Sequence, residues 1–497
     1  MQSKNKKTSS QKPSVDVADL RSALKFLSTL PNQLINIEEP VDHVKELAGI
    51  YKIFAGTPTK PPTRSGPAAL FEKIKGYNNS RVVAGVLGNR KRVALLLGAA
   101  SEPLHQVLLK ALQHPVNSSR FTGGKAPCQE VVHRSPLDIQ KIIPVPGNTE
   151  LDAGPYFSMG LVRGEDPDTG EADVTIHRLC VQGPDRLTCW FTPGRHIDYF
   201  RMKAEKRGQP LPISINIGLD PAVYLAACFE PPTTPLGFDE LGIAGGLRGR
   251  PVELVDCVSV KAKAIANAEV VLEGEVLPGK RMREDAGTRT GFAMPEFPGY
   301  MGRAQAELPI IKITALTHRK NPIVQTIVGP GEEHCNLAGI PTEASIFRLI
   351  DDSMPGRLLN VYAHPSGGGK LLAILQFEKL SASDEGRQRQ AALTALAAFS
   401  ELKHVILVDK DVDIFDTNDV LWAMTTRYQG DASTLFIPGV RCHPLDPSQS
   451  PEFSSSIKAE GITCKTIFDC TVPYALRDRF IRSPFVEVDE KIIKKYL

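Results

Sequence analysis

The interpretation of the fold depends most on the stretch Asp173-Val-Thr-Ile-His-Arg-Leu-Cys-Val181. Its β-branched and apolar residues predict a β-strand. Because side chains alternate between the two faces of a strand, Asp173 and His177 should share one face and Arg178 should point to the other. A bulge or a bend would be needed to bring Asp173 and Arg178 into one site.

Similar strand signals recur between residues 144 and 328, where Pro and Gly separate the segments. Short strands with this spacing are typical of a barrel or a sandwich. Helices are expected at 196–206 and 221–228. The expected strands are 157–162, 173–181, 187–191, 213–217, 252–260, 269–277, 310–316 and 323–328.

Helical and strand patterns alternate on both sides of this segment. Before it, helices are expected at 17–30, 89–97 and 102–112, with a strand at 81–87. After it, helices are expected at 342–352, 385–400 and 418–427, with strands at 358–362, 371–377 and 405–408. The strand–helix–strand order near the C-terminus predicts a βαβ crossover and a partly parallel sheet.

Length and composition limit the class of protein. A chain of 497 residues is too long for one hydrophobic core. A net charge of +3 gives no electrostatic footprint for nucleic acid, and no apolar run is long enough for a membrane span. Nine cysteines without a C-x-x-C pair suggest thiols in a reducing compartment. The basic start reads as a disordered tail without a targeting signal, so we expect a cytoplasmic protein with a small-molecule partner.

Several residues have the chemistry of a metal or acid–base site. Asp173, His196 and Glu240 could ligate a divalent ion, and the oxygen-rich set favours Mg²⁺ or Mn²⁺; packing or capping roles remain the alternative. Glu296 lies between apolar residues in Met-Pro-Glu-Phe-Pro, where desolvation would raise its pKa and suit it to donate a proton. A solvent-exposed glutamate at a loop end is the alternative.

Arg178 could hold a carboxylate by two parallel hydrogen bonds, or form only a surface ion pair. His334 and His443 lie next to acidic residues in segments that we expect to be loops. Such histidines suit proton transfer or the binding of phenolic hydroxyls, although each alone is more often structural. The run Gly367-Gly-Gly-Lys370 lacks the Ser or Thr of a phosphate-binding loop, so a hairpin turn is the preferred interpretation.

Eight ordered blocks resemble the UbiD family of decarboxylases, within it the branch acting on protocatechuate and gallate. The resemblance covers nearly the whole chain after the basic tail. The matching blocks are 173–181, 269–275, 295–300, 328–334, 384–390, 409–415 with 422–427, 445–449 and 463–473.

The resemblance implies a disordered tail (1–16), an N-terminal α/β region (17–125), a split β-barrel of the flavin-reductase-like kind (126–330) and a C-terminal α/β domain for self-association (331–497). It also implies prenylated FMN supplied by a flavin prenyltransferase, with Mn²⁺ or Mg²⁺ and K⁺ at its phosphate. Asp173, His196 and Glu240 correspond to the metal ligands, and Lys403 is a candidate for the phosphate. The residues expected at the cofactor are Thr175, Ile176, Arg178, Arg195, His196, Glu240 and Lys403.

Carbon dioxide loss from an aromatic acid leaves an electron pair that the ring cannot delocalise, so the cofactor must act as an electron sink. The resemblance implies that Arg178 orients the carboxylate, that Glu296 donates the proton, and that His334 and His443 bind ring hydroxyls. Gly291 stands where many relatives have a second glutamate, and Glu284, Asp285 or His334 could replace it. Asp173 stands where most relatives have asparagine, which adds a negative charge at the metal.

The leading hypothesis is reversible, non-oxidative decarboxylation of protocatechuate to catechol or of gallate to pyrogallol, by a homodimer or homohexamer. A decarboxylase of another aromatic or heteroaromatic acid and a non-catalytic prenyl-flavin carrier are the alternatives. The closing residues 488–497 are expected to form a short helix that docks on a partner subunit.

Overall fold

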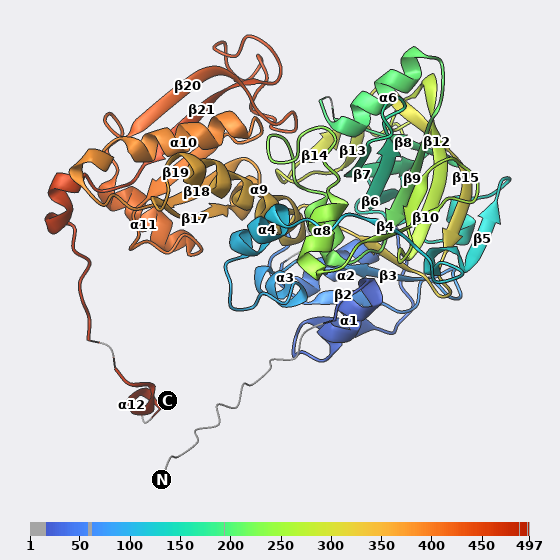
Figure 1. Cartoon of the computed structure of the whole chain (residues 1–497), viewed down its shortest axis with the longest axis horizontal. Coiled ribbons are helices and arrows are strands. Elements are labelled where there is room, and N and C mark those ends of the chain that lie inside the picture. The colour runs from blue at the N-terminus through green and yellow to red at the C-terminus, as the bar shows by residue number, and fades with distance from the viewer. Residues whose placement is uncertain (1–15, 58–61, 193, 487, 495, 497) are drawn as a thin grey trace.

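The structure is a computed structural model that describes residues 16–57, 62–192, 194–486, 488–494 and 496. The predicted basic tail lies outside the described residues except for Asp16. The chain forms an N-terminal α/β region, a central β-barrel and a C-terminal α/β domain, with helix α9 (Glu332–Ser353) running between barrel and C-terminal domain (Figure 1). Among the described residues, none of the helices combines the length and the apolar character that a membrane crossing requires.

The N-terminal region contains a four-stranded sheet in the order β1-β2-β3-β16. Strand β16 (Ile323–Thr326) was expected in the barrel but pairs in parallel with β3. It is buried on both faces, and such a strand carries no alternation that would tell one sheet from another. The other elements are β1 (Leu34–Ile37), β2 (Ala68–Phe71), β3 (Arg81–Ala84), α1 (Leu20–Ser28), α2 (Leu47–Phe54), α3 (Arg90–Leu96) and α4 (Leu104–Gln113).

The predicted barrel is confirmed as a closed antiparallel sheet. Its order is β12-β9-β6-β7-β8-β15, the pairing of β12 with β15 closes it, and β5 (Val131–Arg134) extends it beyond β15. Closure removes exposed strand edges, and the inward-facing residues pack into one core. The six strands are β6 (Tyr156–Glu165), β7 (Ala172–Val181), β8 (Arg186–Cys189), β9 (Leu211–Ile217), β12 (Val270–Met282) and β15 (Leu308–His318).

The middle segment also holds elements outside the barrel wall. The predicted barrel strand 252–260 is wrong in its placement, because β10 (Glu253–Asp256) forms a small sheet with β4 (Ser119–Arg120) and β11 (Lys263–Ile265).

Helix α8 (Leu241–Arg248) was not predicted. A Cβ atom at Gly245 would come within 2.1 Å of the Val116 carbonyl oxygen, so close packing requires the glycines that weaken the helical pattern. The other elements of the middle segment are α5 (Ile139–Ile142), α6 (His196–Lys206), α7 (Pro221–Ala226), β13 (Phe292–Pro295) and β14 (Met301–Arg303).

The C-terminal domain is a five-stranded sheet in the order β17-β18-β19-β21-β20. The predicted crossover is confirmed, since β18 and β19 pair in parallel with α10 between them. Strands β20 (Thr434–Arg441) and β21 (Ile462–Asp469) were not predicted. Helix α9 begins ten residues before its predicted start at 342. The prediction began after Pro341 because proline usually interrupts a helix, but here Pro341 lies inside α9. The remaining elements are β17 (Leu358–Ala363), β18 (Leu372–Phe377), α10 (Arg387–Ala398), β19 (His404–Val408), α11 (Thr417–Arg427) and α12 (Glu490–Ile493).

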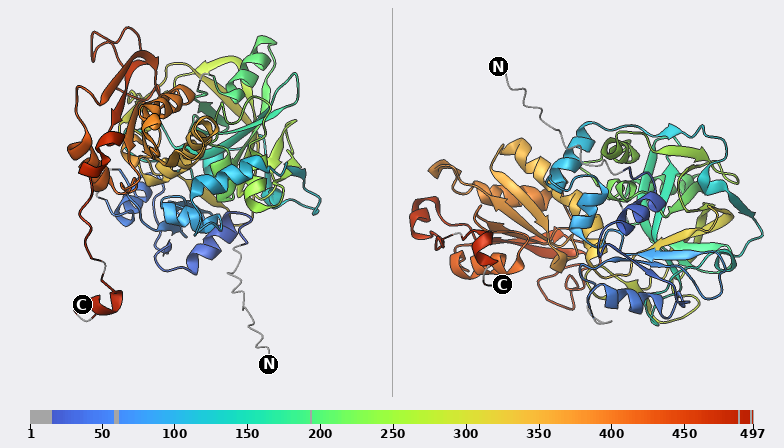
Figure 2. Two further views of the ribbon diagram at one scale, coloured as in Figure 1. Left: turned by 60° about the vertical axis from the view of Figure 1, so that its left-hand side comes forward. Right: turned by 90° about the horizontal axis from the view of Figure 1, so that it is seen from below.

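The chain after β21 follows the C-terminal domain as far as Arg482, which pairs with Asp419. Beyond it, α12 lies apart from both the barrel and the C-terminal domain (Figures 1 and 2). The docking of this segment on a partner subunit stays a prediction.

Candidate active site

A cavity of about 210 Å³ lies between the barrel and the C-terminal domain. It collects seven of the residues singled out from the sequence, from segments more than 250 positions apart. Ligand pockets are commonly found at such domain interfaces. These seven are Thr175, Ile176, Arg178, Arg195, Glu296, His334 and His443.

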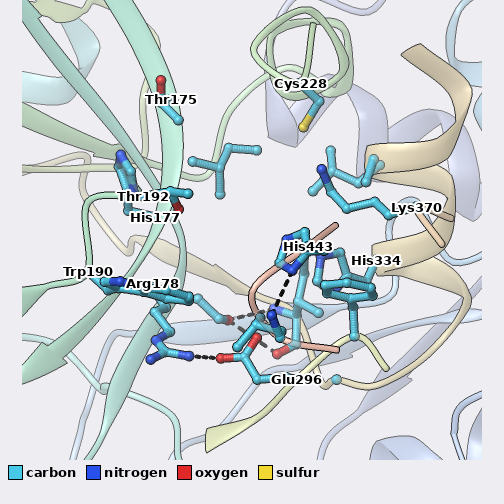
Figure 3. A pocket seen from close by; sticks show the side chains of 18 of the residues that line it. Thr175, His177, Arg178, Trp190, Thr192, Cys228, Glu296, His334, Lys370 and His443 are labelled. Atoms are coloured by element: carbon cyan, nitrogen blue, oxygen red, sulfur yellow. Dashed lines mark hydrogen bonds and ion pairs between the residues drawn. The ribbon is translucent and has the colours of Figure 1, made fainter. Parts of the chain in front are cut away.

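Arg178 and Glu296 form an ion pair at one end of the cavity (Figure 3). Their side chains are 10% and 12% exposed. The surroundings expected for Glu296 were apolar, but the Arg178 guanidinium also lies against its carboxylate. Sequence spacing did not reveal this contact. Gly302 leaves room for the pair: a Cβ atom there would lie 3.1 Å from Glu296 Oε1 and 3.2 Å from Arg178 Nη1.

Glu284 is the second acid at Arg178. Arg178 Nη2 donates to Glu284 Oε2 at 3.2 Å, while the Tyr156 hydroxyl donates to Glu284 Oε1 at 3.0 Å. Asp285 instead accepts from the backbone N–H of Gly291 at 2.8 Å. Of the acids considered as replacements at Gly291, Glu284 is thus the one that contacts the arginine.

A bulge in β6 lies opposite Arg178 of β7 and affects the direction of the Arg178 side chain. The pairs Phe157↔Leu179 and Gly160↔His177 leave two residues of β6 opposite Arg178 alone. Bulges twist a sheet locally and change the direction of side chains. A bulge of the kind considered from the sequence is therefore present in this strand pair, but the extra residue is in β6.

Lys370 lies at the other end of the cavity, in a network of charges that the sequence did not reveal. Its Nζ atom is 3.0 Å from Glu230 Oε1 and 2.5 Å from Glu401 Oε2. Arg195 Nη2 lies 2.6 Å from Glu230 and 3.2 Å from Glu401. Burial by itself would lower the pKa of Lys370, but the two glutamates outweigh it and raise that pKa above its ordinary value, so the lysine is charged at neutral pH.

The predicted hairpin at Gly367-Gly-Gly-Lys370 is confirmed by the antiparallel pairing of β17 with β18. A Cβ atom at Gly369 would lie 2.6 Å from the Cys335 carbonyl oxygen. The glycines thus let the turn approach α9 closely enough to place Lys370 in the cavity. The glycine run is the only local feature of the sequence that indicates this close approach, and it predicts a turn without placing Lys370 in a cavity.

His334 and His443 both line the cavity near Lys370 (Figure 3). His334 was expected in a loop and instead lies in the first turn of α9. Burial lowers the pKa of His334 to about 4, and Lys370 and His443 act in the same direction. Burial also lowers the pKa of His443 to about 4 despite nearby Glu401. Both imidazoles are therefore neutral at pH 7 and can donate or accept a hydrogen bond.

Asp173, His196 and Glu240 lie together beside the cavity. One ligand atom from each falls within 4.8 Å of the others, and His196 Nδ1 is 3.4 Å from Asp173 Oδ1. Burial and the neighbouring Asp173 raise the pKa of Glu240 well above its ordinary range. Its Oε2 atom is buried without a hydrogen-bond partner. Two buried acids and a histidine in this arrangement can hold a divalent cation.

Lys403 does not reach the cavity. Its Nζ atom pairs with Asp446 Oδ2 at 2.7 Å, and Lys403 is not among the residues that line the pocket. The structure places Lys370, from the preceding hairpin, in the cavity instead. Sequence spacing could not distinguish the two lysines, because both lie next to strands of the same sheet.

Comparison with known proteins identifies the family. Models of the N-terminal, Rift-related and C-terminal domains of 3-octaprenyl-4-hydroxybenzoate carboxy-lyase match residues 30–112, 120–332 and 335–470. The chain belongs to the UbiD family. Members of this family are carboxy-lyases, and the resemblance noted in the sequence is confirmed.

Three relatives show how much of this UbiD-family chain is shared. The gallate decarboxylase of Lactiplantibacillus plantarum is 47% identical over 96% of this chain and 99% of its own length. The apo 3,4-dihydroxybenzoic acid decarboxylase of Enterobacter cloacae is 55% identical, with a TM-score of 0.92 over 97% of this chain and 99% of that one. An evolved dimeric form of the UbiD-class enzyme HmfF of Pelotomaculum thermopropionicum, in complex with prFMN, is 34% identical, with a TM-score of 0.83 over 97% and 100% of the two chains.

Proposed function

We propose that this UbiD-family enzyme catalyses the reversible, non-oxidative decarboxylation of a benzoate with two or three ring hydroxyls, protocatechuate or gallate. The cavity itself carries the proposal. It has a guanidinium for a carboxylate at one end, and Lys370 with two neutral imidazoles for hydroxyls at the other. Relatives named for gallate and 3,4-dihydroxybenzoate decarboxylation support it.

At the carboxylate end, Arg178 binds the acid group of the substrate and Glu296 delivers the proton that replaces carbon dioxide. A substrate carboxylate competes with Glu296 for the same guanidinium, because both can accept its paired N–H groups. Glu284 keeps its own contact with Arg178 Nη2 at 3.2 Å and holds the guanidinium in place. Binding of substrate thus separates Glu296 from Arg178 and allows it to take up and transfer a proton.

At the hydroxyl end, His334, His443 and Lys370 supply the hydrogen bonds. A buried hydroxyl left without a partner costs about 1–3 kcal/mol, so an apolar pocket would reject these substrates. His443 Nδ1 accepts from the Leu445 N–H at 3.1 Å, which leaves Nε2–H directed to other partners. A substrate without ring hydroxyls would offer no hydrogen-bond partner to the two imidazoles, whereas Lys370 keeps Glu230 and Glu401, and this favours hydroxylated acids over cinnamate-like ones.

The residues present fit a metal-bound flavin phosphate. The Asp173–His196–Glu240 cluster has the donor set for Mn²⁺ or Mg²⁺ and an unpaired Glu240 oxygen, and Thr175 Oγ1 donates to Asp173 Oδ2 at 2.9 Å. Thr175, Ile176 and Arg195, which line the cavity, would contact the cofactor. When bound, prenylated FMN supplies the electron sink for decarboxylation, and its presence in an HmfF structure supports this choice. The K⁺ ion, the prenyltransferase, Lys403 as a phosphate ligand and a dimer or hexamer stay predictions.

We expect Glu240→Gln to weaken Mn²⁺ binding by at least about 100-fold, because it removes the charge of a buried metal ligand. Asp173→Asn should cost less, because the amide oxygen can still coordinate. Calorimetric titration of metal-free protein with Mn²⁺ measures both, with Glu165→Gln, at the end of β6, as the control. Unchanged Mn²⁺ affinity in Glu240→Gln would place the metal elsewhere.

The proposed reaction is tested with a panel of acids on enzyme loaded with prenylated FMN. Protocatechuate or gallate should be converted at least about 100-fold more efficiently than benzoate or cinnamate, in line with about 3 kcal/mol for two unpaired polar groups. Phenol formation and carbon dioxide release are measured together. If carbon dioxide is released only from a different acid, that acid is the substrate in place of protocatechuate and gallate. If no acid releases carbon dioxide although prenylated FMN is bound, the carrier function is favoured.

A further inference from the structure

The turn between β13 and β14 carries Glu296 and, immediately after it, Phe297. Two backbone hydrogen bonds hold this turn: the Glu296 N–H donates to the Tyr300 carbonyl at 2.8 Å, and the Gly299 N–H to the Glu296 carbonyl at 2.9 Å. The Phe297 side chain is only 6% exposed. The β13–β14 turn lies outside the barrel wall, and it buries its aromatic side chain against another part of the molecule.

The Phe297 ring enters a socket formed by residues of α9 and the C-terminal domain. It meets His443 edge to face, with ring centroids 4.6 Å apart and an interplanar angle of 82°, and His334 at 5.6 Å and 78°. Edge-to-face contacts of this kind have a preferred geometry and contribute beyond the buried area. We call His334, His443 and Gly368 the Phe297 socket.

Gly368 closes the socket and has no room for a side chain. A Cβ atom there would lie 2.2 Å from Phe297 Cδ2 and 2.9 Å from the Phe297 carbonyl oxygen, and the residue has a φ of +63°. Glycine is the residue that combines this conformation with such a close approach. The glycine run that precedes Lys370 thus serves the Phe297 ring as well as the lysine.

We propose that Phe297 is a positioning residue that fixes the β13–β14 turn, which carries Glu296, to the C-terminal domain and so holds Glu296, His334 and His443 in one arrangement around the substrate. The proton donor and the two hydroxyl-binding histidines belong to different domains. Phe297 follows Glu296 directly in the chain, and its ring packs against both His334 and His443. This inference rests on the proposed function, since it assigns a common substrate to the three residues.

The ring also keeps water from the two imidazoles. Burial is the main cause of the low pKa of His334 and of His443, each about 4. Arg195, Lys370, Glu230 and Glu401 are the charged groups that act on them. Loss of the ring should therefore raise both pKa values towards the ordinary value near 6.5.

The first test compares Phe297→Ala and Phe297→Leu in the full chain. A displacement of about 1 Å in a catalytic group can cost about 100-fold in rate, so we expect kcat/KM to fall about 100-fold in Phe297→Ala, mostly in kcat. Phe297→Leu should recover to within about 10-fold of the original enzyme, because it refills most of the socket. Phe399→Leu is the control, since Phe399 is equally buried, at 6%, in the core of the C-terminal domain.

The second test is a double-mutant cycle between Phe297→Ala and Gly368→Ala. The added methyl group collides with the ring, so Gly368→Ala should reduce kcat/KM about as much as Phe297→Ala. The double variant should be no worse than either single one, because the ring, which makes the closest collision at 2.2 Å, is gone. Gly356→Ala is the matched control: its φ is +68° in the same domain, but a Cβ atom there meets nothing within 4 Å.

Histidine NMR titration provides a readout that does not need activity. In Phe297→Ala two imidazole signals should titrate between about pH 5 and 7, whereas in the original protein and in Phe399→Leu they should not. Additive effects in the cycle together with unchanged histidine titration would overturn the proposal. If the NMR effect appears but no acid is decarboxylated by any variant or by the original enzyme, the proposed function fails and the role of Phe297 in joining the two domains stands.

Discussion

Glu296→Gln should lower kcat by about 10²- to 10⁴-fold, the usual contribution of a positioned general acid. Glutamine has nearly the same shape and can still accept a hydrogen bond from Arg178, so the cavity keeps its form. It has no carboxylic proton to transfer to the ring carbon. Product formation measured with prenylated FMN bound, alongside the absorbance of the bound flavin, separates loss of chemistry from loss of cofactor.

Glu307→Gln is the control for this change, because Glu307 is exposed just after the same hairpin. A second check uses hydrogen–deuterium exchange into the phenolic product, which requires the same proton donor in reverse and should also be lost. Turnover within about 3-fold of the original enzyme in Glu296→Gln would show that another group delivers the proton.

Arg178→Lys should reduce kcat/KM by about 10²-fold or more even though the positive charge is kept. Arg178 contacts Glu296 and Glu284 and lies over the Trp190 ring, 4.8 Å from its centroid. A lysine cannot span two carboxylates with a planar fork or stack in the same way. Each charge-assisted hydrogen bond that is lost costs about 1.5–3 kcal/mol.

Steady-state kinetics and the dissociation constant of a non-reacting benzoate check this expectation together. Both KM and the dissociation constant should rise, since Arg178 holds the carboxylate before the reaction. Arg186→Lys on the exposed end of β8 provides the control. Normal substrate affinity in Arg178→Lys would show that the carboxylate binds at another cation, with Lys370 the first candidate.

Local sequence patterns were enough for the barrel strands and for individual site residues. The stretch 173–181 lies in strand β7, as its β-branched and apolar residues predicted, and Asp173, His196 and Glu240 meet within 4.8 Å as their residue types suggested. The destination of a buried strand was not predictable: β16 has the composition of the barrel strands but pairs with β3. Its partner depends on where the chain returns after β15, which no local pattern encodes.

The charged network at the hydroxyl end was missed for the same reason. Glu230, Lys370 and Glu401 are far apart in sequence, and each by itself resembles an ordinary surface residue. They become functional candidates only when they are buried together, with Nζ–O distances of 3.0 and 2.5 Å. Glu284, which follows the end of β12, was one of several candidates in the sequence, and only its 3.2 Å contact identifies it as the second acid at Arg178.

By itself, the amino-acid sequence determined which side chains are available: an arginine and acids for a carboxylate, a mixed oxygen and nitrogen set for a metal, and glycines where the backbone must pass closely. Only the tertiary structure decided which of them meet, and therefore which are charged. Arg178 and Glu296 pair, Lys370 enters the cavity and Lys403 does not, because the packing of the C-terminal domain against the barrel sets these distances. Burial and short-range electrostatics depend on distances through space, and distance along the chain does not specify them.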